Sequence, residues 1–229
     1  IGLPTAAILA DVGKYKVLGV DINPEIINKV NQGAIHIVES GLENIVSKVV
    51  KAGSLRASLK PEKSDVFIIA VPTPLEGNET NIPEPNIKYV LSAATAIADV
   101  ICEGDLVIVE STSPLGTTQQ VADLIFSLTK FERTSIDFAY CPERVLPGKI
   151  LEELISNDRV IGGLSEQASL RGKQFYSTFC KGELLTTNTV TAEMVKLTEN
   201  AYRDLNIAFA NEISIFCERF NIDIHELIK

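Results

Sequence analysis

Metal-binding side chains are scarce in this sequence of 229 residues, which contains two histidines, His36 and His225, and four cysteines. The cysteines are widely spaced and form no Cys-x-x-Cys pair. This spacing favours neither a zinc site nor a disulfide framework. We therefore expect reduced thiols and no metal centre.

Long apolar runs and an excess of basic charge are also missing. No apolar run reaches the roughly 18 residues that cross a bilayer, and the first residues do not resemble a secretory signal. Lysine and arginine number 21 against 30 acidic residues, for a net charge of −9. Nucleic acids and anionic membranes need a concentrated basic face, so we expect neither as a partner. The sequence predicts a soluble cytoplasmic protein, and its 45% hydrophobic content suffices for a full core.

Short apolar, β-branched runs alternate with helical patterns along the chain. The expected strands are residues 16–20, 66–71, 106–109, 138–141 and 159–162, with an edge strand at 183–186. The expected helices are residues 4–12, 24–32, 42–52, 86–100, 117–128 and 166–179. This order predicts an α/β fold, a Rossmann-like doubly wound parallel sheet with helices on both faces.

A long helix is expected to follow this sheet, because residues 191–220 contain neither glycine nor proline. At about 1.5 Å per residue it would span roughly 45 Å, too long for one layer of the sheet, so we expect it to link two domains. Asn221 is a candidate stop. Asp223, followed three residues later by Glu226, forms the capping-box pattern of a further helix.

Three polar residues, Lys196, Asn200 and Arg203, fall on one stripe of this helix at i, i+4 and i+7. The remaining positions are largely apolar and predict that the helix is mostly buried. A buried lysine loses its charge or needs a partner, so the stripe indicates an anionic or oxygen-rich ligand. The alternative is an ordinary solvated helix face.

The first 21 residues have the pattern of the back half of a dinucleotide-binding fingerprint. Gly2 precedes an amphipathic helix, and Asp21 ends the next strand. In such a fingerprint the helix N-terminus faces a pyrophosphate and the carboxylate holds a ribose diol, which favours NAD over NADP. Alternatively, Asp21 caps the helix that begins at Pro24.

Hydroxyl-bearing residues follow two of the expected strands, at 71–74 and 110–114. Ligands of doubly wound sheets bind at these carboxyl ends, so the hydroxyls are candidate ligand contacts. They are equally typical of turns and helix caps, a role that Thr117 or Thr118 would fill.

The next strand is followed by residues 141–148, which bring a cysteine and a carboxylate close in sequence. Cys141 as a nucleophile with Glu143 as its base is the weaker interpretation, because a cysteine on a buried strand usually only packs. Glu143, a partly desolvated carboxylate beside a prolyl loop, is the better candidate for acid–base chemistry.

Six motifs together resemble the UDP-glucose/GDP-mannose dehydrogenase family of nucleotide-sugar 6-dehydrogenases, over the whole of the chain. They are residues 1–7, 20–23, 71–74, 110–114, 140–148 and 192–200. Within the family, segments 142–148, 157–163 and 206–212 are most similar to the branch that oxidises UDP-N-acetyl-D-mannosamine. The resemblance implies oxidation of the sugar C6 alcohol to a carboxylate with two NAD+, through an intermediate bound to a cysteine.

The resemblance also implies roles for individual residues. The cofactor positions would be Ile1, Gly2, Asp21, Thr73 and Thr118. The substrate positions would be Arg144, Val145, Lys196, Asn200 and Arg203, and the catalytic positions Lys196, Glu143, Asn200 and Thr112. Lys196 would stabilise oxyanions or relay the alcohol proton, and Glu143 would activate the water that hydrolyses the thioester.

The family pattern implies a division of the chain. Residues 1–186 would form the NAD-binding domain, with its first strand and first two glycines lying before Ile1. Residues 187–229 would form a central connecting and dimerisation helix and the start of the next helix. None of the four cysteines matches the family's nucleophile, so the nucleophile and the C-terminal nucleotide-sugar domain are expected beyond Lys229. The implied partners are a UDP-sugar substrate and a second copy of the chain.

Three alternatives stay open at this point. In the first alternative, the substrate is a different nucleotide sugar, namely UDP-glucose, UDP-N-acetylglucosamine or GDP-mannose. A non-catalytic NAD-binding or dimerisation module would keep the fold without the chemistry, although it has no physical need for Glu143, Lys196 and Asn200 together. A single-hydride dehydrogenase of a hydroxy acid would use the lysine and the asparagine but no thiol.

Overall fold

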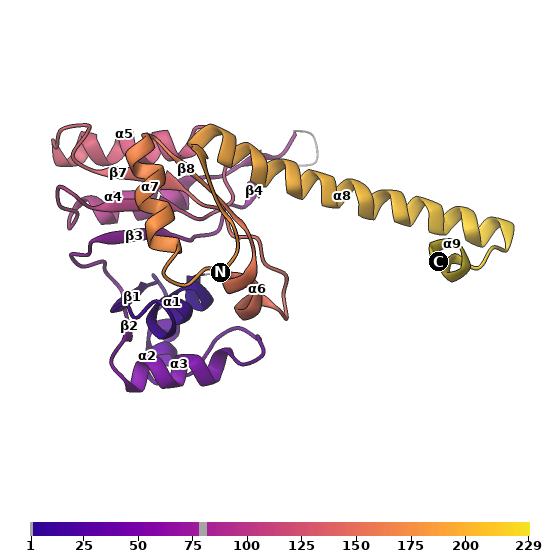
Figure 1. Cartoon of the computed structure of the whole chain (residues 1–229), viewed down its shortest axis with the longest axis horizontal. Helices are drawn as coiled ribbons and strands as arrows, with labels where there is room; N and C mark the ends of the chain where they lie inside the picture. Colours follow the sequence, from indigo (N-terminus) through magenta and orange to yellow (C-terminus); the bar gives the residue numbers. More distant parts are fainter. Residues whose placement is uncertain (1, 78–81) are drawn as a thin grey trace.

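The computed structural model describes residues 2–77 and 82–229, which form an α/β body from which one long helix projects (Figure 1). The helices are α1 (Gly2–Asp11), α2 (Pro24–Asn31), α3 (Leu42–Lys51), α4 (Lys88–Ala98), α5 (Thr117–Thr129), α6 (Ile150–Ser156), α7 (Glu166–Tyr176), α8 (Thr189–Phe220) and α9 (Ile224–Ile228). The strands are β1 (Val17–Val20), β2 (Leu55–Ser58), β3 (Val66–Ile69), β4 (Leu75–Glu76), β5 (Glu84–Pro85), β6 (Leu106–Val109), β7 (Asp137–Tyr140), β8 (Arg159–Gly163) and β9 (Leu184–Asn188).

The main sheet has the order β3-β6-β7-β8-β9, and a second sheet pairs β1 with β2 in parallel. Pairing in the main sheet is parallel except between β7 and β8, where Ala139 lies opposite Gly163. The predicted α/β fold and each predicted strand are confirmed. The sequence analysis missed β2, the short β4–β5 hairpin and α6. β2 buries only Leu55 fully, and α6 is short, so neither carries a long apolar pattern.

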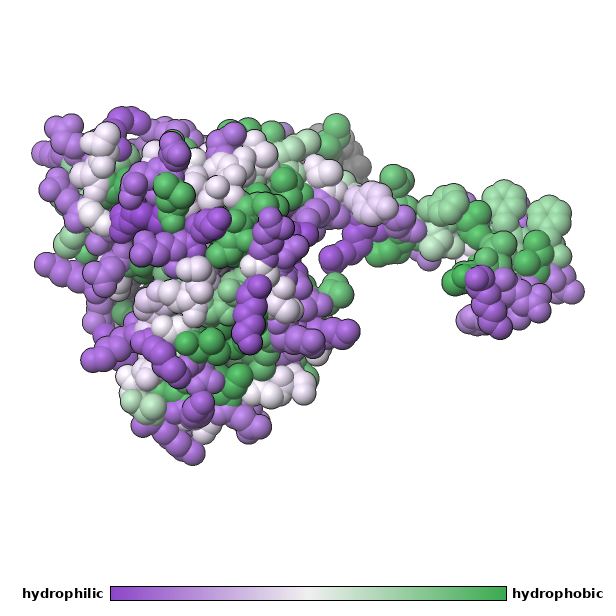
Figure 2. Space-filling model, viewed as in Figure 1, coloured by the Kyte–Doolittle hydropathy of each residue, from purple (hydrophilic) through white to green (hydrophobic). Residues whose placement is uncertain are grey.

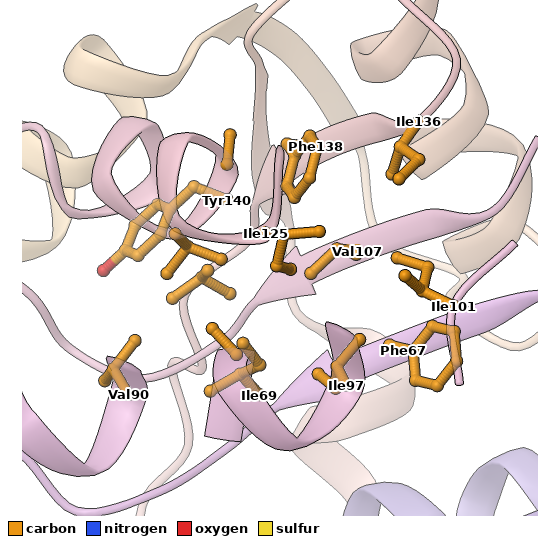
Figure 3. Packing of buried hydrophobic residues seen from close by; sticks show 14 of the residues in the cluster. Phe67, Ile69, Val90, Ile97, Ile101, Val107, Ile125, Ile136, Phe138 and Tyr140 are labelled. Carbon is orange, nitrogen blue, oxygen red and sulfur yellow. The ribbon is translucent and has the colours of Figure 1, made fainter. Parts of the chain in front are cut away.

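Helices cover both faces of the main sheet, as expected for a doubly wound fold. On one face, α4 and α5 pack against β3, β6 and β7, and Figure 3 shows Phe67, Val107 and Phe138 among the side chains of this cluster. On the other face, α1, α6 and α7 contribute Ile8, Leu154, Phe175 and Tyr176. Because β3, β6 and β7 run parallel, the loops that follow these three strands leave from the same edge of the sheet.

The prediction that α8 is mostly buried is wrong. Its first turns pack on the body, but every residue from 201 to 212 is exposed, and Leu205, Phe209 and Phe216 are between 55% and 69% exposed. The helix projects beyond the body, so its apolar positions have no protein surface to pack against (Figures 1 and 2). Its apolar pattern indicated that another surface covers this helix, and none of the described residues of the body does so. In the described ranges, no helix is both long and apolar enough to cross a membrane.

The ends of α8 agree with the expected signals. Asn188 caps its start by accepting a hydrogen bond from the Thr191 N–H at 2.9 Å, and Asn221 ends it in the left-handed conformation with φ of 57°. Asp223 then caps α9 by accepting from the His225 N–H at 2.8 Å. The second helix predicted from the Asp223 cap is therefore confirmed.

Gly162 on β8 allows the base of α8 to approach the sheet closely. A Cβ built at this residue would lie 2.4 Å from the Asn188 carbonyl oxygen and 2.7 Å from the Ala192 Cβ. Real Cβ atoms do not make contacts this short, and one of the two is backbone. A side chain at residue 162 would therefore displace the start of α8 from the sheet.

We predict that Gly162→Ala lowers the free energy of unfolding by about 1–3 kcal/mol, the usual range for overpacking. Gly19→Ala is the matched control, because its Cβ would meet the Arg56 carbonyl oxygen at an ordinary 3.8 Å. Chemical denaturation of both variants measures the difference. Equal free energies of unfolding for the two variants would show that the base of α8 can move without loss of stability.

Candidate active site

The loops that follow β3 and β6 are bonded to each other through their hydroxyl groups. Thr73 donates from Oγ1 to the Thr112 carbonyl oxygen at 2.6 Å. Ser111 Oγ accepts from the Val71 N–H at 2.9 Å and donates to the Val71 carbonyl oxygen at 2.8 Å. These hydroxyls therefore hold one loop against the other. Thr73 and Thr112 are half-buried and so keep part of their surface at this edge of the sheet.

The N-terminus of α5 is capped from a distance by Glu193, a residue on the first turns of α8. Its carboxylate accepts from the Gly116 N–H at 2.6 Å, and from the Thr118 N–H and hydroxyl at 2.9 and 2.8 Å. Glu193 and Thr118 are both fully buried. The alternative in which Thr117 or Thr118 caps this helix is wrong, because the N-cap residue is Gly116 and makes no side-chain cap.

Lys196 reaches the loop after β7 from the next turn of α8. Its Nζ donates to the Glu143 carbonyl oxygen at 2.6 Å. Burial lowers the pKa of Lys196, and Arg203 and Arg144 act in the same direction, whereas Glu199 and Glu143 oppose them. The ammonium form is therefore easier to deprotonate than that of a free lysine.

A groove of about 740 Å³ runs beside this contact. Its lining includes Arg144, Lys196, Asn200 and Arg203, so the structure brings together four of the five predicted substrate residues. The remainder of the lining is Asn157, Asp158, Glu199, Tyr202, Asn206, Ile207 and Ala210. Val145 is half-buried against the apolar cluster of α6 and α7 instead. Two guanidinium groups and an ammonium face two carboxylates in the groove, which suits an anionic ligand with many oxygen atoms.

Glu143 is 5% exposed and points into the protein. Its Oε1 accepts from the Arg144 N–H at 2.6 Å, and its Oε2 lies 3.5 Å from Arg159 Nη2. That second oxygen has no hydrogen-bond partner within the described residues. A buried carboxylate oxygen without a hydrogen-bond partner keeps the capacity to accept a hydrogen bond from water or a ligand.

Behind Glu143 lies a buried polar cluster that the sequence analysis did not identify. Tyr176 donates from its hydroxyl to Glu110 Oε1 at 3.1 Å, and the Arg159 guanidinium lies 4.9 Å from the centre of the Tyr176 ring. Burial, followed by the charge of Glu143, raises the pKa of Glu110 to about 7. Burial also raises the pKa of the inaccessible Cys141 thiol to about 12, which removes Cys141 as a nucleophile.

The predicted cofactor residues lie on the other side of the edge, around α1 and β1. Gly2 lies next to the end of β3. A Cβ built at Gly2 would lie 3.8 Å from the Ala70 Cβ, an ordinary contact, so close packing does not require a glycine at this position. Asp21 follows β1, and its Oδ1 accepts from the Asn23 N–H at 2.8 Å. Asn23 caps α2, so the alternative in which Asp21 is the cap is wrong. Ile1 lies outside the described residues.

Glu39 connects this half of the molecule to the Glu143 loop, a role that the sequence analysis also missed. It is 7% exposed, and its carboxylate accepts from the Gly148 N–H at 2.9 Å and the Ile150 N–H at 3.0 Å. An acidic residue between two hydrophobic segments gave no signal of a partner more than 100 residues away. Across the described ranges, no group of three or more metal-ligating side chains comes together.

We predict that Glu110 makes the protein less stable as the pH rises. A carboxyl group whose pKa is near 7 when folded and near 4.5 when unfolded binds more protons in the folded state between these values. The free energy of unfolding therefore falls across that window, by about 3 kcal/mol at most from this group. Glu110→Gln mimics the protonated form and should flatten the dependence measured by denaturation from pH 4.5 to 8. An unchanged slope would contradict the assignment.

Comparison with known proteins places the chain in one family. Residues 1–180 match the NAD binding domain of the UDP-glucose/GDP-mannose dehydrogenase family, and residues 190–229 match its central domain. A UDP-N-acetyl-D-mannosamine dehydrogenase from Campylobacter jejuni is 52% identical to the chain, in an alignment that covers the whole chain and 57% of that protein. An NDP-N-acetyl-D-galactosaminuronic acid dehydrogenase from Ralstonia nicotianae is 48% identical, over the whole chain and 55% of that protein.

A solved structure of UDP-D-ManNAc dehydrogenase from Pyrococcus horikoshii superimposes with a TM-score of 0.93 at 42% identity, over the whole chain and 54% of that protein. The chain thus spans about half the length of the curated relatives it matches. It belongs to the UDP-glucose/GDP-mannose dehydrogenase family and contains the family's NAD-binding domain and the start of its central domain.

Proposed function

We propose that this chain supplies the NAD-binding domain and central helix of a UDP-N-acetyl-D-mannosamine 6-dehydrogenase. The observation that carries the proposal is the contact of Lys196 Nζ with the Glu143 carbonyl oxygen, beside a groove that also contains Asn200 and Arg203. An ammonium, an amide and a guanidinium line this groove, and the ammonium is bonded to the backbone of the residue that carries the buried carboxylate. The names of the relatives at 52% and 42% identity support the choice of sugar.

The geometry of the sheet edge fits NAD. Two helix N-termini, those of α1 and α5, adjoin the carboxyl ends of the strands, and both would attract a phosphate. The Glu193 carboxylate already fills the N-terminus of α5. We therefore assign the pyrophosphate to Gly2 and the first turn of α1, and the adenosine ribose to Asp21 after β1. Thr73 lies on the loop between these groups and the groove, and the buried Thr118 would act only through its bond to Glu193.

Residues of the groove would hold the nucleotide sugar. Arg203 and Asn200 face it from α8, and Arg144 faces it from the loop after β7. Arg144 is paired with Glu199, and its Nη1 donates to the Asp158 carbonyl oxygen at 3.3 Å, so its guanidinium has a fixed direction. Fixed donors of this kind suit sugar hydroxyls and phosphate oxygens.

The reaction would oxidise the C6 alcohol in two steps, and bound NAD+ supplies the hydride acceptor for each. Lys196, with a lowered pKa, is suited to accept the alcohol proton and then to stabilise negative charge on oxygen, with Asn200 as a neutral donor. Glu143 carries the open Oε2 that is suited to deprotonate water when a covalent acyl intermediate is hydrolysed. Thr112 would lie beside the reacting carbon.

We predict different defects for the two residues in the full-length enzyme. Lys196→Ala should slow both NADH-forming steps by roughly 100-fold to 1,000-fold, the usual loss for one positioned electrostatic group. Glu143→Gln should preserve a burst of NADH and trap a protein-bound acyl adduct, because the charge near the oxyanion is removed and only water activation is lost. Stopped-flow absorbance and intact-mass spectrometry distinguish the two. Loss of the burst with intact substrate and NAD binding would exclude the hydrolytic role of Glu143.

A second sugar is favoured by one observation, the 48% identity to the galactosaminuronic acid dehydrogenase. Both names describe N-acetylated hexosamine derivatives, and the two sugars differ in configuration at the carbon that carries the acetamido group and at one ring hydroxyl. Comparing kcat/KM for UDP-N-acetyl-D-mannosamine, UDP-N-acetyl-D-galactosamine and UDP-glucose decides among them. Comparable turnover of UDP-glucose would remove the preference for an N-acetylated sugar.

We further propose that the protein forms a homodimer through α8 and is located in the cytoplasm. Large hydrophobic side chains are exposed on the projecting part of the helix, namely Tyr202, Leu205, Ile207, Phe209, Ile215, Phe216 and Phe220. Figure 2 shows hydrophobic residues, in green, along this part of the molecule. A second copy would cover them, since an isologous interface places the same helix on both sides. All four cysteines, each within the described residues, are free thiols, as suits a reducing compartment.

We predict a dimer at micromolar concentration in sedimentation velocity experiments on the full-length protein. Phe209→Glu with Phe216→Glu should shift the species to monomer, because two buried carboxylates would face apolar surface. Lys173→Glu changes an exposed residue of α7, away from α8, and as the control should leave the dimer intact. A wild-type monomer would exclude this interface.

A further inference from the structure

The base of α8 is attached to the body at two points that lie one turn apart on the same helix face. Glu193 bonds to the start of α5, and Lys196 bonds to the Glu143 carbonyl oxygen. We propose that Glu193 is a positioning residue that sets the depth and direction in which Lys196 enters the active site. The inference rests on the proposed function only for the effect on turnover.

Few other contacts between α8 and the body could set the position of Lys196. Ala192 packs on the sheet above Gly162, and from residue 201 to 212 the helix is exposed. The orientation of α8 relative to the sheet is therefore determined by its first three turns. Among those turns, Glu193 is the fully buried charged residue, and its three hydrogen bonds are directed, whereas apolar contacts permit sliding and rotation.

Both the charge and the shape of Glu193 matter at the start of α5. One oxygen accepts the Gly116 N–H, and the other accepts the Thr118 N–H and hydroxyl. A glutamine has the same volume but presents an NH2 group to one side, where it would meet the N–H of Gly116 or the donors of Thr118. The amide also loses the attraction between a carboxylate and a helix N-terminus. Glu193→Gln should thus loosen the attachment while preserving packing.

The titration of Lys196 reports on its position. Lys196 is surrounded by Glu199 and Arg203 on its own helix, by Glu143 and Arg144 on the loop after β7, and by Asp158 across the groove. Burial is the main cause of its lowered pKa. If the helix base moves outward, water reaches the ammonium and the pKa rises toward the ordinary value of lysine. A merely structural role for Glu193 would leave this pKa unchanged in the folded protein.

The experiment measures acetylation of Lys196 by a water-soluble N-hydroxysuccinimide ester, by peptide mass spectrometry, from pH 7 to 11. It compares wild type, Glu193→Gln and Glu166→Gln in the full-length protein, and does not require the sugar. Glu166 also lies in the first turn of a helix, α7, but is exposed, so its variant controls for loss of a helix N-terminal charge. We expect Glu193→Gln to raise the apparent pKa of Lys196 and Glu166→Gln to match wild type.

In the same proteins, turnover of UDP-N-acetyl-D-mannosamine should fall by about tenfold to 100-fold in Glu193→Gln. The KM for NAD should change less than about threefold, because a misplaced catalytic group slows the chemistry more than it weakens cofactor binding. A wild type that titrates as expected but does not oxidise the sugar would count against the proposed function alone. An unchanged Lys196 titration in folded Glu193→Gln would overturn the positioning role.

Thr118→Val covers the case in which Glu193→Gln does not fold. It removes the hydroxyl that donates to Glu193 at 2.8 Å and leaves the two N–H donors in place. A smaller rise in the pKa of Lys196 in this variant would support the role of Glu193. A titration identical to wild type would overturn it.

Discussion

The seating of the first turns of α8 on the sheet is the constraint on which the site depends. Gly162 gives the helix room to approach β8, and Asn188 starts it in a defined direction. Glu193 then connects it to α5, and Lys196 connects it to the loop after β7. Because side chains on a helix have a fixed relation to one another, seating the base also places Asn200 and Arg203 along the groove. One local attachment thus positions residues over two further turns.

The architecture could be predicted from the sequence because its signals are local. Short apolar runs separated by helical patterns predicted each strand of the main sheet, and Asn221 and Asp223 predicted the end of one helix and the start of another. The burial of α8 was predicted wrongly for an instructive reason. An apolar helix pattern shows that a surface will be covered, but it does not show which molecule covers it.

The site was predictable where residues share a helix and unpredictable where they meet across the fold. Lys196, Asn200 and Arg203 lie on one stripe, and the structure places all three in the groove. Glu39, Glu193 and Arg159 were missed, because each acts on a partner that no local spacing indicates. Glu193 had one usable signal, since an acid three residues before Lys196 on the same face is expected near the same site. The hydroxyls of Thr73 and Ser111 were assigned to ligands or caps but bond loop to loop.

Two buried carboxylates hold the cofactor side and the substrate side of the site in a fixed position relative to each other. Glu39 comes from the half that contains α1 and β1, and it holds the loop that carries Glu143 through two backbone N–H groups. Glu193 comes from the substrate side, and it holds the start of α5, next to the loop that carries Thr112. In both cases a carboxylate from one side accepts backbone donors from the other, so the bond survives changes in side chains along the loop.

This arrangement also separates two kinds of glutamate at the edge of the sheet. Glu39 and Glu193 have their oxygen atoms bonded to backbone donors, which hold each carboxylate in one position. Glu143 has one oxygen without a hydrogen-bond partner within the described residues, and Glu110 behind it is bonded only to hydroxyls, which can rotate to accept as well as donate. The carboxylates that fix the geometry thus differ from Glu143 and Glu110 in their hydrogen-bond partners, because backbone donors hold the first pair on both oxygens and do not hold the second pair in this way.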